Sequence, residues 1–200
     1  MSNPAPERLA KQIGFILEID RLKTILRRTY ILHADRRENS AEHSWHLAIL
    51  AVVLAEYSNE PVDVGRVVKM AVIHDIVEVD AGDTFIYDDA GNARKAAAEQ
   101  RAADRIFGLL PSDQAGEFRA IWDEFEAGVT PESRLARAID RLMPLLHNFH
   151  TSGRAWRENG ITADRVLDRN KTIADGSRVL WEFARGLINE AVESGFLKKP

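Results

Sequence analysis

Residues 64–78 read VGRVVKMAVIHDIVE, and this stretch decides how the rest of the chain is interpreted. Apolar residues recur along it at helical spacing, from Val64 to Val77. It lies between Asp63 and Asp80, and about sixteen residues between such breakers is longer than a typical strand. The stretch therefore predicts a buried helix over about residues 63–78, although its β-branched residues would also suit a strand.

The end of this helix carries three polar side chains among apolar ones, namely His74, Asp75 and Glu78. Buried polar groups are costly unless something compensates them. Glu78 follows Asp75 by three residues and His74 by four, so all three can open on one cavity. That arrangement suits a metal ion and an acid.

Two more polar residues, His43 and Asp140, interrupt other apolar helical segments. Singly, each would be interpreted as a buried side chain satisfied by its neighbours. Together with His74 and Asp75 they supply two imidazole and two carboxylate donors. Because the chain has no cysteine, any metal must be held by such groups. The set predicts a divalent metal centre, for Mn, Co, Zn, Ni or Fe, with positions left open for water.

The rest of the chain repeats the helical periodicity. It predicts helices over about residues 7–26, 40–54, 63–78, 92–110, 112–128, 131–150 and 163–192, the last with a candidate break at Asp175-Gly176. A charged loop is expected after the first helix, and no strand alternation, repeat or linker is visible. We therefore predict an all-α chain, a single domain over residues 1–200 with six to eight helices.

Composition limits the possible functions. A chain of 200 residues should bury roughly 70% of the surface that it exposes when unfolded, which is enough for one core. The 31 acidic residues exceed the 27 basic ones and no long cationic run occurs, so we expect no binding to nucleic acid or to a membrane. The start of the sequence lacks the features of a signal peptide, and we expect a cytoplasmic protein.

The ordered motifs are Arg37-Glu38-Asn39-Ser40-Ala41-Glu42-His43, then His74-Asp75 through Gly82-Asp83, then Asp140. In this order they resemble the HD-domain metal-dependent phosphohydrolases, and among them the 5′-deoxynucleotidase branch. The resemblance implies a helical bundle and spans about residues 8–150, whereas the part at about 163–194 is similar only in being helical.

The resemblance also implies roles for individual residues. The implied metal ligands are His43, His74, Asp75 and Asp140. Arg28 is expected to hold the substrate phosphate, Glu78 to assist proton transfer and Asp83 to shape the site. The chain departs from the branch after the arginine, where Thr29 and then Tyr30 stand in place of an aromatic residue that helps to exclude a ribose 2′-hydroxyl.

The chemistry of the donor set agrees with these roles, because a divalent ion neutralises phosphate charge and lowers the pKa of bound water from 15.7 towards ~7. We predict an enzyme that releases phosphate from nucleoside 5′-monophosphates, with deoxynucleotides as the expected substrates. An HD-type phosphodiesterase, a nucleoside polyphosphate hydrolase and a non-catalytic nucleotide-binding module are the alternatives. The resemblance further suggests a homodimer.

Three more histidines extend the picture. His46 lies three residues after His43, and His147 and His150 lie two and nearly three turns after Asp140, so a second metal is one interpretation of these residues. The commoner outcome for such residues is a surface histidine or a satisfied core histidine.

Overall fold

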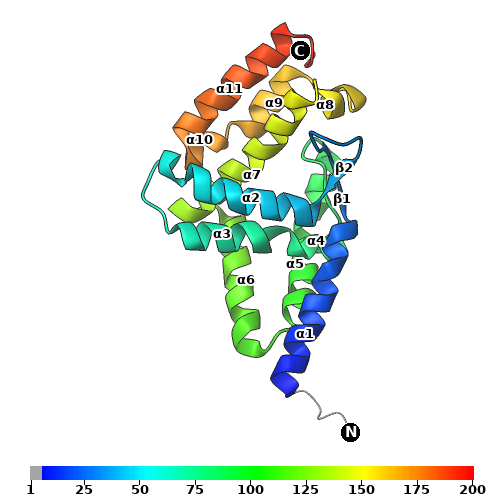
Figure 1. Ribbon diagram of the computed structural model, residues 1–200, viewed down its shortest axis with the longest axis vertical. Helices are drawn as coiled ribbons and strands as arrows, with labels where there is room; N and C mark the ends of the chain where they lie inside the picture. Colours follow the sequence, from blue (N-terminus) through cyan, green and yellow to red (C-terminus); the bar gives the residue numbers. More distant parts are fainter. Residues whose placement is uncertain (1–5) are drawn as a thin grey trace.

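The computed structural model describes residues 6–200 and is mostly helical, with a small hairpin (Figure 1). In this part of the chain, the helices of seven or more residues are α1 (Glu7–Ile19), α2 (Ser40–Leu54), α3 (Val64–Ile73), α5 (Asp89–Phe107), α6 (Ser112–Ala127), α7 (Pro131–His150), α9 (Ala163–Asn170) and α11 (Arg178–Glu193). Shorter helices are α4 (Glu78–Ala81), α8 (Arg154–Glu158) and α10 (Ile173–Gly176), with 3₁₀ turns η1 (Asp20–Thr24), η2 (Ala55–Tyr57) and η3 (His74–Val77). The strands are β1 (Leu26–Tyr30) and β2 (Arg37–Asn39).

Helix α7 runs through the middle of the molecule. Thr130 caps it and Pro131 occupies its first turn. It contacts α2, α3 and α6 on one side and α10 and α11 on the other. Figure 1 shows α2 and α3 side by side, with α1, α5 and α6 below them and α9 to α11 above. Because Leu135 and Ile139 are fully buried, α7 forms the centre of the core and holds Asp140 near it.

The prediction of an all-α chain is wrong between residues 26 and 39. The predicted helix over residues 7–26 ends at Ile19, and β1 pairs antiparallel with β2 to form a hairpin. Arg27 and Thr29 face inward on β1, whereas Leu26 and Arg28 are exposed. Because the inward residues are polar, the alternation of apolar residues that signals a strand is missing from this sequence.

The predicted helix over residues 63–78 is also not continuous. Asp63 caps α3, which ends at Ile73 and gives way to the 3₁₀ turn η3 and then to α4. Helix α4 ends at Gly82, whose φ of +73° favours glycine. A 3₁₀ turn repeats every three residues, so it aligns Asp75 with Glu78 more closely than an α-helix would.

The C-terminal segment is divided into three helices rather than one, and Gly176 ends α10 at the expected break. A Cβ on Gly176 would lie 2.3 Å from the carbonyl oxygen of Arg134, so the glycine lets α10 approach α7 closely. The helices of the described chain include none with the length and apolar character needed to cross a membrane.

Candidate metal centre

The structure brings three of the four predicted ligands together. His43 comes from α2, His74 from η3 and Asp140 from α7. One ligand atom from each lies within 4.8 Å of the other two. Three elements far apart in the sequence therefore meet at one point, and their mixed imidazole and carboxylate donors suit a divalent transition metal.

His74 is oriented for this role by its own backbone. Its Nδ1 atom lies 2.9 Å from the carbonyl oxygen of Ala71, so Nδ1 carries the proton and donates it there. Its Nε2 atom is buried and has no hydrogen-bond partner among the described residues. The Nε1 atom of Trp122 donates to the His74 carbonyl at 3.2 Å and holds the turn in place. The free Nε2 lone pair fits a metal ion.

His43 is completely buried and is placed between two carboxylates. Its Nε2 atom lies 2.9 Å from Oδ1 of Asp140, and its Nδ1 atom lies 3.5 Å from Oε2 of Glu38. A carboxylate behind a ligating imidazole sets the tautomer and raises the basicity of the ring. Glu38 is 1% exposed and lies behind the His43 ring, at a separation longer than that of a hydrogen bond.

Asp75 lies at the edge of the cluster. Its Oδ1 atom is 3.0 Å from Nε2 of His74, and its Oδ2 atom is 3.9 Å from Nε2 of His43. Oδ2 also accepts a hydrogen bond from Nη1 of Arg27 at 2.8 Å. Asp75 therefore lies outside the group of three, with Oδ1 beside His74 and Oδ2 paired with Arg27.

The carboxylates of this cluster favour protonated histidines at the place where a metal ion would bind. Burial opposes protonation of His74, but the neighbouring carboxylates, Asp75 first, raise its pKa to about 10. Burial favours the neutral form of Asp140, yet the hydrogen bond from His43 and the nearby charge of His74 hold its pKa well below the usual value. A divalent cation would replace these protons, because it binds the same nitrogen and oxygen atoms.

Glu78, the predicted proton donor, is 3% exposed and begins α4. Ser40 Oγ donates a hydrogen bond to its Oε2 atom at 2.6 Å. Burial, and then the charge of Asp75, raises the pKa of Glu78 to about 8. Glu78 therefore carries its proton at neutral pH. Sequence reasoning missed Ser40, whose only signal is its position in the motif that ends at His43.

The two arginines of β1 take different places. Arg28, the predicted phosphate ligand, lines the cavity with an exposed side chain. Nη1 of Arg27 contacts Asp75 at 2.8 Å and Asp83 at 3.8 Å, because the strand pleat turns Arg27 inward. Burial raises the pKa of Asp83 more than the charge of Arg27 lowers it. Sequence reasoning assigned no role to Arg27.

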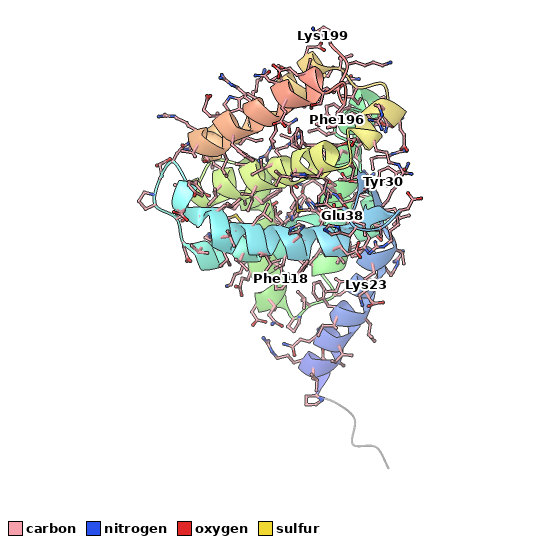
Figure 2. All side chains as sticks on the ribbon, turned by 45° about the horizontal axis from the view of Figure 1, so that its top comes forward. Lys23, Tyr30, Glu38, Phe118, Phe196 and Lys199 are labelled. Carbon is pink, nitrogen blue, oxygen red and sulfur yellow. The ribbon has the colours of Figure 1, made fainter. Side chains whose placement is uncertain are left out.

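A cavity opens next to the cluster. Residues beside the metal cluster line one part of it, and residues to which sequence reasoning gave no role line the rest. The lining includes His74, Asp75, Glu78, Asp83, Asp140, Arg27, Arg28, Thr29, Phe85, Tyr87, Lys95, Glu99, Arg141, Asn148, Trp156 and Asn170. Trp156 and Asn170 belong to α8 and α9, so the C-terminal part of the chain closes one end of this cavity. Tyr30 is not in the lining. Its hydroxyl donates to Glu158 at 3.0 Å, and Figure 2 shows it on the hairpin near α8.

Arg141, which follows Asp140 directly, is a second residue that sequence reasoning missed. It lines the cavity and forms no hydrogen bond or ion pair with any described residue. Burial lowers its pKa, and Asp140 opposes that effect. A largely desolvated guanidinium without a carboxylate partner is a binding group for an anion.

Comparisons with known proteins agree with this geometry. A family model described as an HD domain matches residues 19–181. A structure from Magnetospirillum magnetotacticum MS-1, described as that of a predicted metal-dependent phosphohydrolase, is 54% identical, covers 98% of each chain and has a TM-score of 0.92. A conserved hypothetical protein from Pyrococcus furiosus, at 22% identity and a TM-score of 0.61, covers 90% of this chain and 99% of its own, and shows the fold alone.

Among curated proteins, the human 5′-deoxynucleotidase HDDC2 is 26% identical over 135 residues, which are 67% of this chain and 65% of its own length. The 5′-deoxynucleotidase hdd1 of Schizosaccharomyces pombe is 27% identical over 143 residues, which are 68% of this chain and 70% of its own length. This chain thus covers less than two thirds of the human relative. The family model extends over most of the sequence and includes every residue of the cluster. The chain therefore belongs to the HD-domain family.

Proposed function

We propose that this protein is a metal-dependent phosphohydrolase that releases phosphate from nucleoside 5′-monophosphates, with deoxynucleotides as the preferred substrates. The observation that carries the proposal is the cluster of His43, His74 and Asp140 beside a cavity that also holds a protonated carboxyl group, Glu78. A metal ion and an acid on one cavity are the parts that hydrolysis of a phosphate monoester needs.

The names of the relatives support the substrate class. The human and yeast proteins are called 5′-deoxynucleotidases, and the Magnetospirillum protein is called a metal-dependent phosphohydrolase. The cavity supports the same class, because its cations suit a phosphate and its aromatic side chains, Tyr87 and Trp156, suit a nucleoside.

The residues of the cavity divide the work. A divalent cation held by His43, His74 and Asp140, with Asp75 beside them, would supply positive charge and an activated water. Arg28 and Arg141 offer guanidinium groups to the phosphate oxygens. Glu78, oriented by Ser40, donates its proton to the leaving 5′-oxygen.

The preference for deoxyribose is the most specific part of the proposed activity. Thr29 lines the cavity where the related branch has an aromatic residue, and Tyr30 is held outside by Glu158. The small threonine leaves more room beside a 2′-carbon than an aromatic ring would. Discrimination against ribose is therefore expected to be weak.

The proposal includes a homodimer. Helix α2 is apolar nearly all round, and one stripe of it is exposed, with Trp45 at 66%, Val52 at 61% and Val53 at 60%. An exposed apolar stripe of this kind is typical of a protein interface. Sedimentation velocity should give twice the mass of the chain, and a monomer at micromolar concentration would overturn this part.

The test of the activity is phosphate release. The purified protein is stripped with a chelator, reloaded with Mn²⁺, Co²⁺ or Zn²⁺, and given a panel of ribo- and deoxynucleoside 5′-monophosphates. The His74→Gln variant is the matched control, because it removes one donor from the cluster. Release that requires metal and His74 supports the proposal. Binding without release, or release only from cyclic nucleotides or polyphosphates, contradicts it.

A further inference from the structure

A second group of potential ligands lies behind the first. Glu38 of β2, His46 of α2 and His147 of α7 each place one ligand atom within 4.8 Å of the other two. Figure 2 shows Glu38 where the hairpin meets α2 and α7. None of the three lines the cavity described above. The group is therefore separate from the proposed substrate site, although it adjoins the first cluster through Glu38.

The spacing within this group fits a cation better than a direct contact. Oε1 of Glu38 and Nδ1 of His147 are 3.8 Å apart, which is too far for a hydrogen bond. Two ligands of one tetrahedral cation, each bonded at about 2.1 Å, lie about 3.4 Å apart. A contraction of a few tenths of an ångström would thus bring these two atoms to ligand separation.

One buried nitrogen of the group lacks a partner among the described residues. His147 is 5% exposed, and its Nδ1 atom is buried with no hydrogen-bond partner among the described residues. Glu38 is 1% exposed, and its Oε2 atom faces Nδ1 of His43 at 3.5 Å and Nε of Arg27 at 3.6 Å. Its Oε1 atom is the one that faces His147, so this oxygen is placed to bind an ion together with the unpaired His147 Nδ1.

His46 supplies the entry path. Its side chain is partly exposed, whereas the other two are buried, so an ion can reach the group from solvent past this ring. The rings of His46 and His147 have centroids 5.7 Å apart and planes inclined at 40°, so they are neighbours without being stacked. Two imidazoles that converge on one carboxylate resemble the donor types of known two-histidine, one-glutamate zinc sites.

We propose that Glu38, His46 and His147 bind a second divalent transition-metal ion, for which Zn²⁺ is the best-matched probe. Water completes the coordination on the side of His46. Glu38 connects the two sites, because its other oxygen lies 3.5 Å from Nδ1 of His43. The second ion lies outside the cavity and does not contact the substrate, so its role is to fix Glu38 and, through it, the orientation of His43.

The experiment counts bound zinc. The full-length protein is stripped with a chelator, reloaded with Zn²⁺, passed over a desalting column and analysed for metal by mass spectrometry. We expect two equivalents in the unchanged protein, one in His46→Gln and in His147→Gln, and one in His74→Gln. His150→Gln is the matched control, since His150 is exposed at the end of α7 and belongs to neither group. It should retain two equivalents.

One equivalent in the unchanged protein, or two in both His46→Gln and His147→Gln, would overturn the second site. Should the buried His147 variant fail to fold, the His46 variant decides, because its side chain is partly exposed. A competition titration should also show that His46→Gln weakens the second equivalent at least about tenfold and leaves the first unchanged. The outcome is independent of phosphate release: two zinc ions without activity would contradict only the proposed function, and activity with one ion only the second site.

Discussion

At the scale of single residues, the proposed reaction requires that Glu78 carry a proton beside the metal cluster. Ser40 orients its carboxyl group at 2.6 Å, and Glu78 is not a member of the cluster formed by His43, His74 and Asp140. We therefore expect Glu78→Gln and Glu78→Ala to keep the full metal content and to lower kcat by roughly 10²–10⁴. Steady-state kinetics and metal analysis on the same samples check this. Unchanged turnover, or loss of the metal, would show that Glu78 is not the acid.

The same carboxyl group makes the stability of the metal-free protein depend on pH. Its pKa is about 8 in the folded state against 4.5 without the fold, so between these values the folded protein binds a proton that the unfolded chain releases. Stability must then fall as pH rises from 4.5 to 8, by on the order of 4 kcal/mol.

Glu78→Gln removes that dependence. In the presence of a chelator, the Tm of the Gln variant should rise relative to the Tm of the unchanged protein as the pH is raised from 5 to 8. Thermal unfolding followed by circular dichroism gives both values. A difference in Tm that stays constant over this range would mean that the carboxyl group is ionised in the folded state.

Arg141 gives a third prediction at this scale. Because its guanidinium has no partner among the described residues and lines the cavity, Arg141→Gln should raise KM for a nucleoside monophosphate by about tenfold or more. Arg134→Gln is the control, since Arg134 lies on the same helix and pairs with Glu60 at the surface. Equal KM values for the two variants would remove Arg141 from the substrate site.

Among the helices and strands, the sequence predicts those whose apolar residues recur at helical spacing, and it misses the others. The predicted helices over residues 40–54 and 131–150 are confirmed as α2 and α7. The hairpin is missed because the inward residues of β1 are Arg27 and Thr29, which serve the site and not the core. The turn η3 is missed because its side chains are as apolar as those of α3 and follow without a breaker.

Close packing between elements can be tested with two glycines. Gly176→Ala would place a methyl group 2.3 Å from the Arg134 carbonyl oxygen, so α10 must move away from α7 at a cost of roughly 1–3 kcal/mol. Gly186 lies in α11 with no atom within 4 Å of an added Cβ, so Gly186→Ala should be neutral or stabilising. Denaturant unfolding compares the two. Equal midpoints would show that the contact at Gly176 is not tight.

At the scale of the whole molecule, the candidate site is assembled from segments that only the fold brings together. The metal cluster could be predicted from residue types and their order, since His43, His74 and Asp140 interrupt apolar helices. The inward arginine, Ser40, Arg141 and the wall from α8 and α9 could not, because each is selected by the direction of a side chain or by helix packing. The last fifty residues thus become part of the cavity through tertiary contacts alone.

The most direct measurement of the central claim is an anomalous difference map from a crystal of the Mn²⁺-loaded protein, recorded at the manganese absorption edge. The account predicts a strong peak within bonding distance of His43 Nε2, His74 Nε2 and a carboxylate oxygen of Asp140. A map without a peak at that point, from protein that retains the fold, would contradict it.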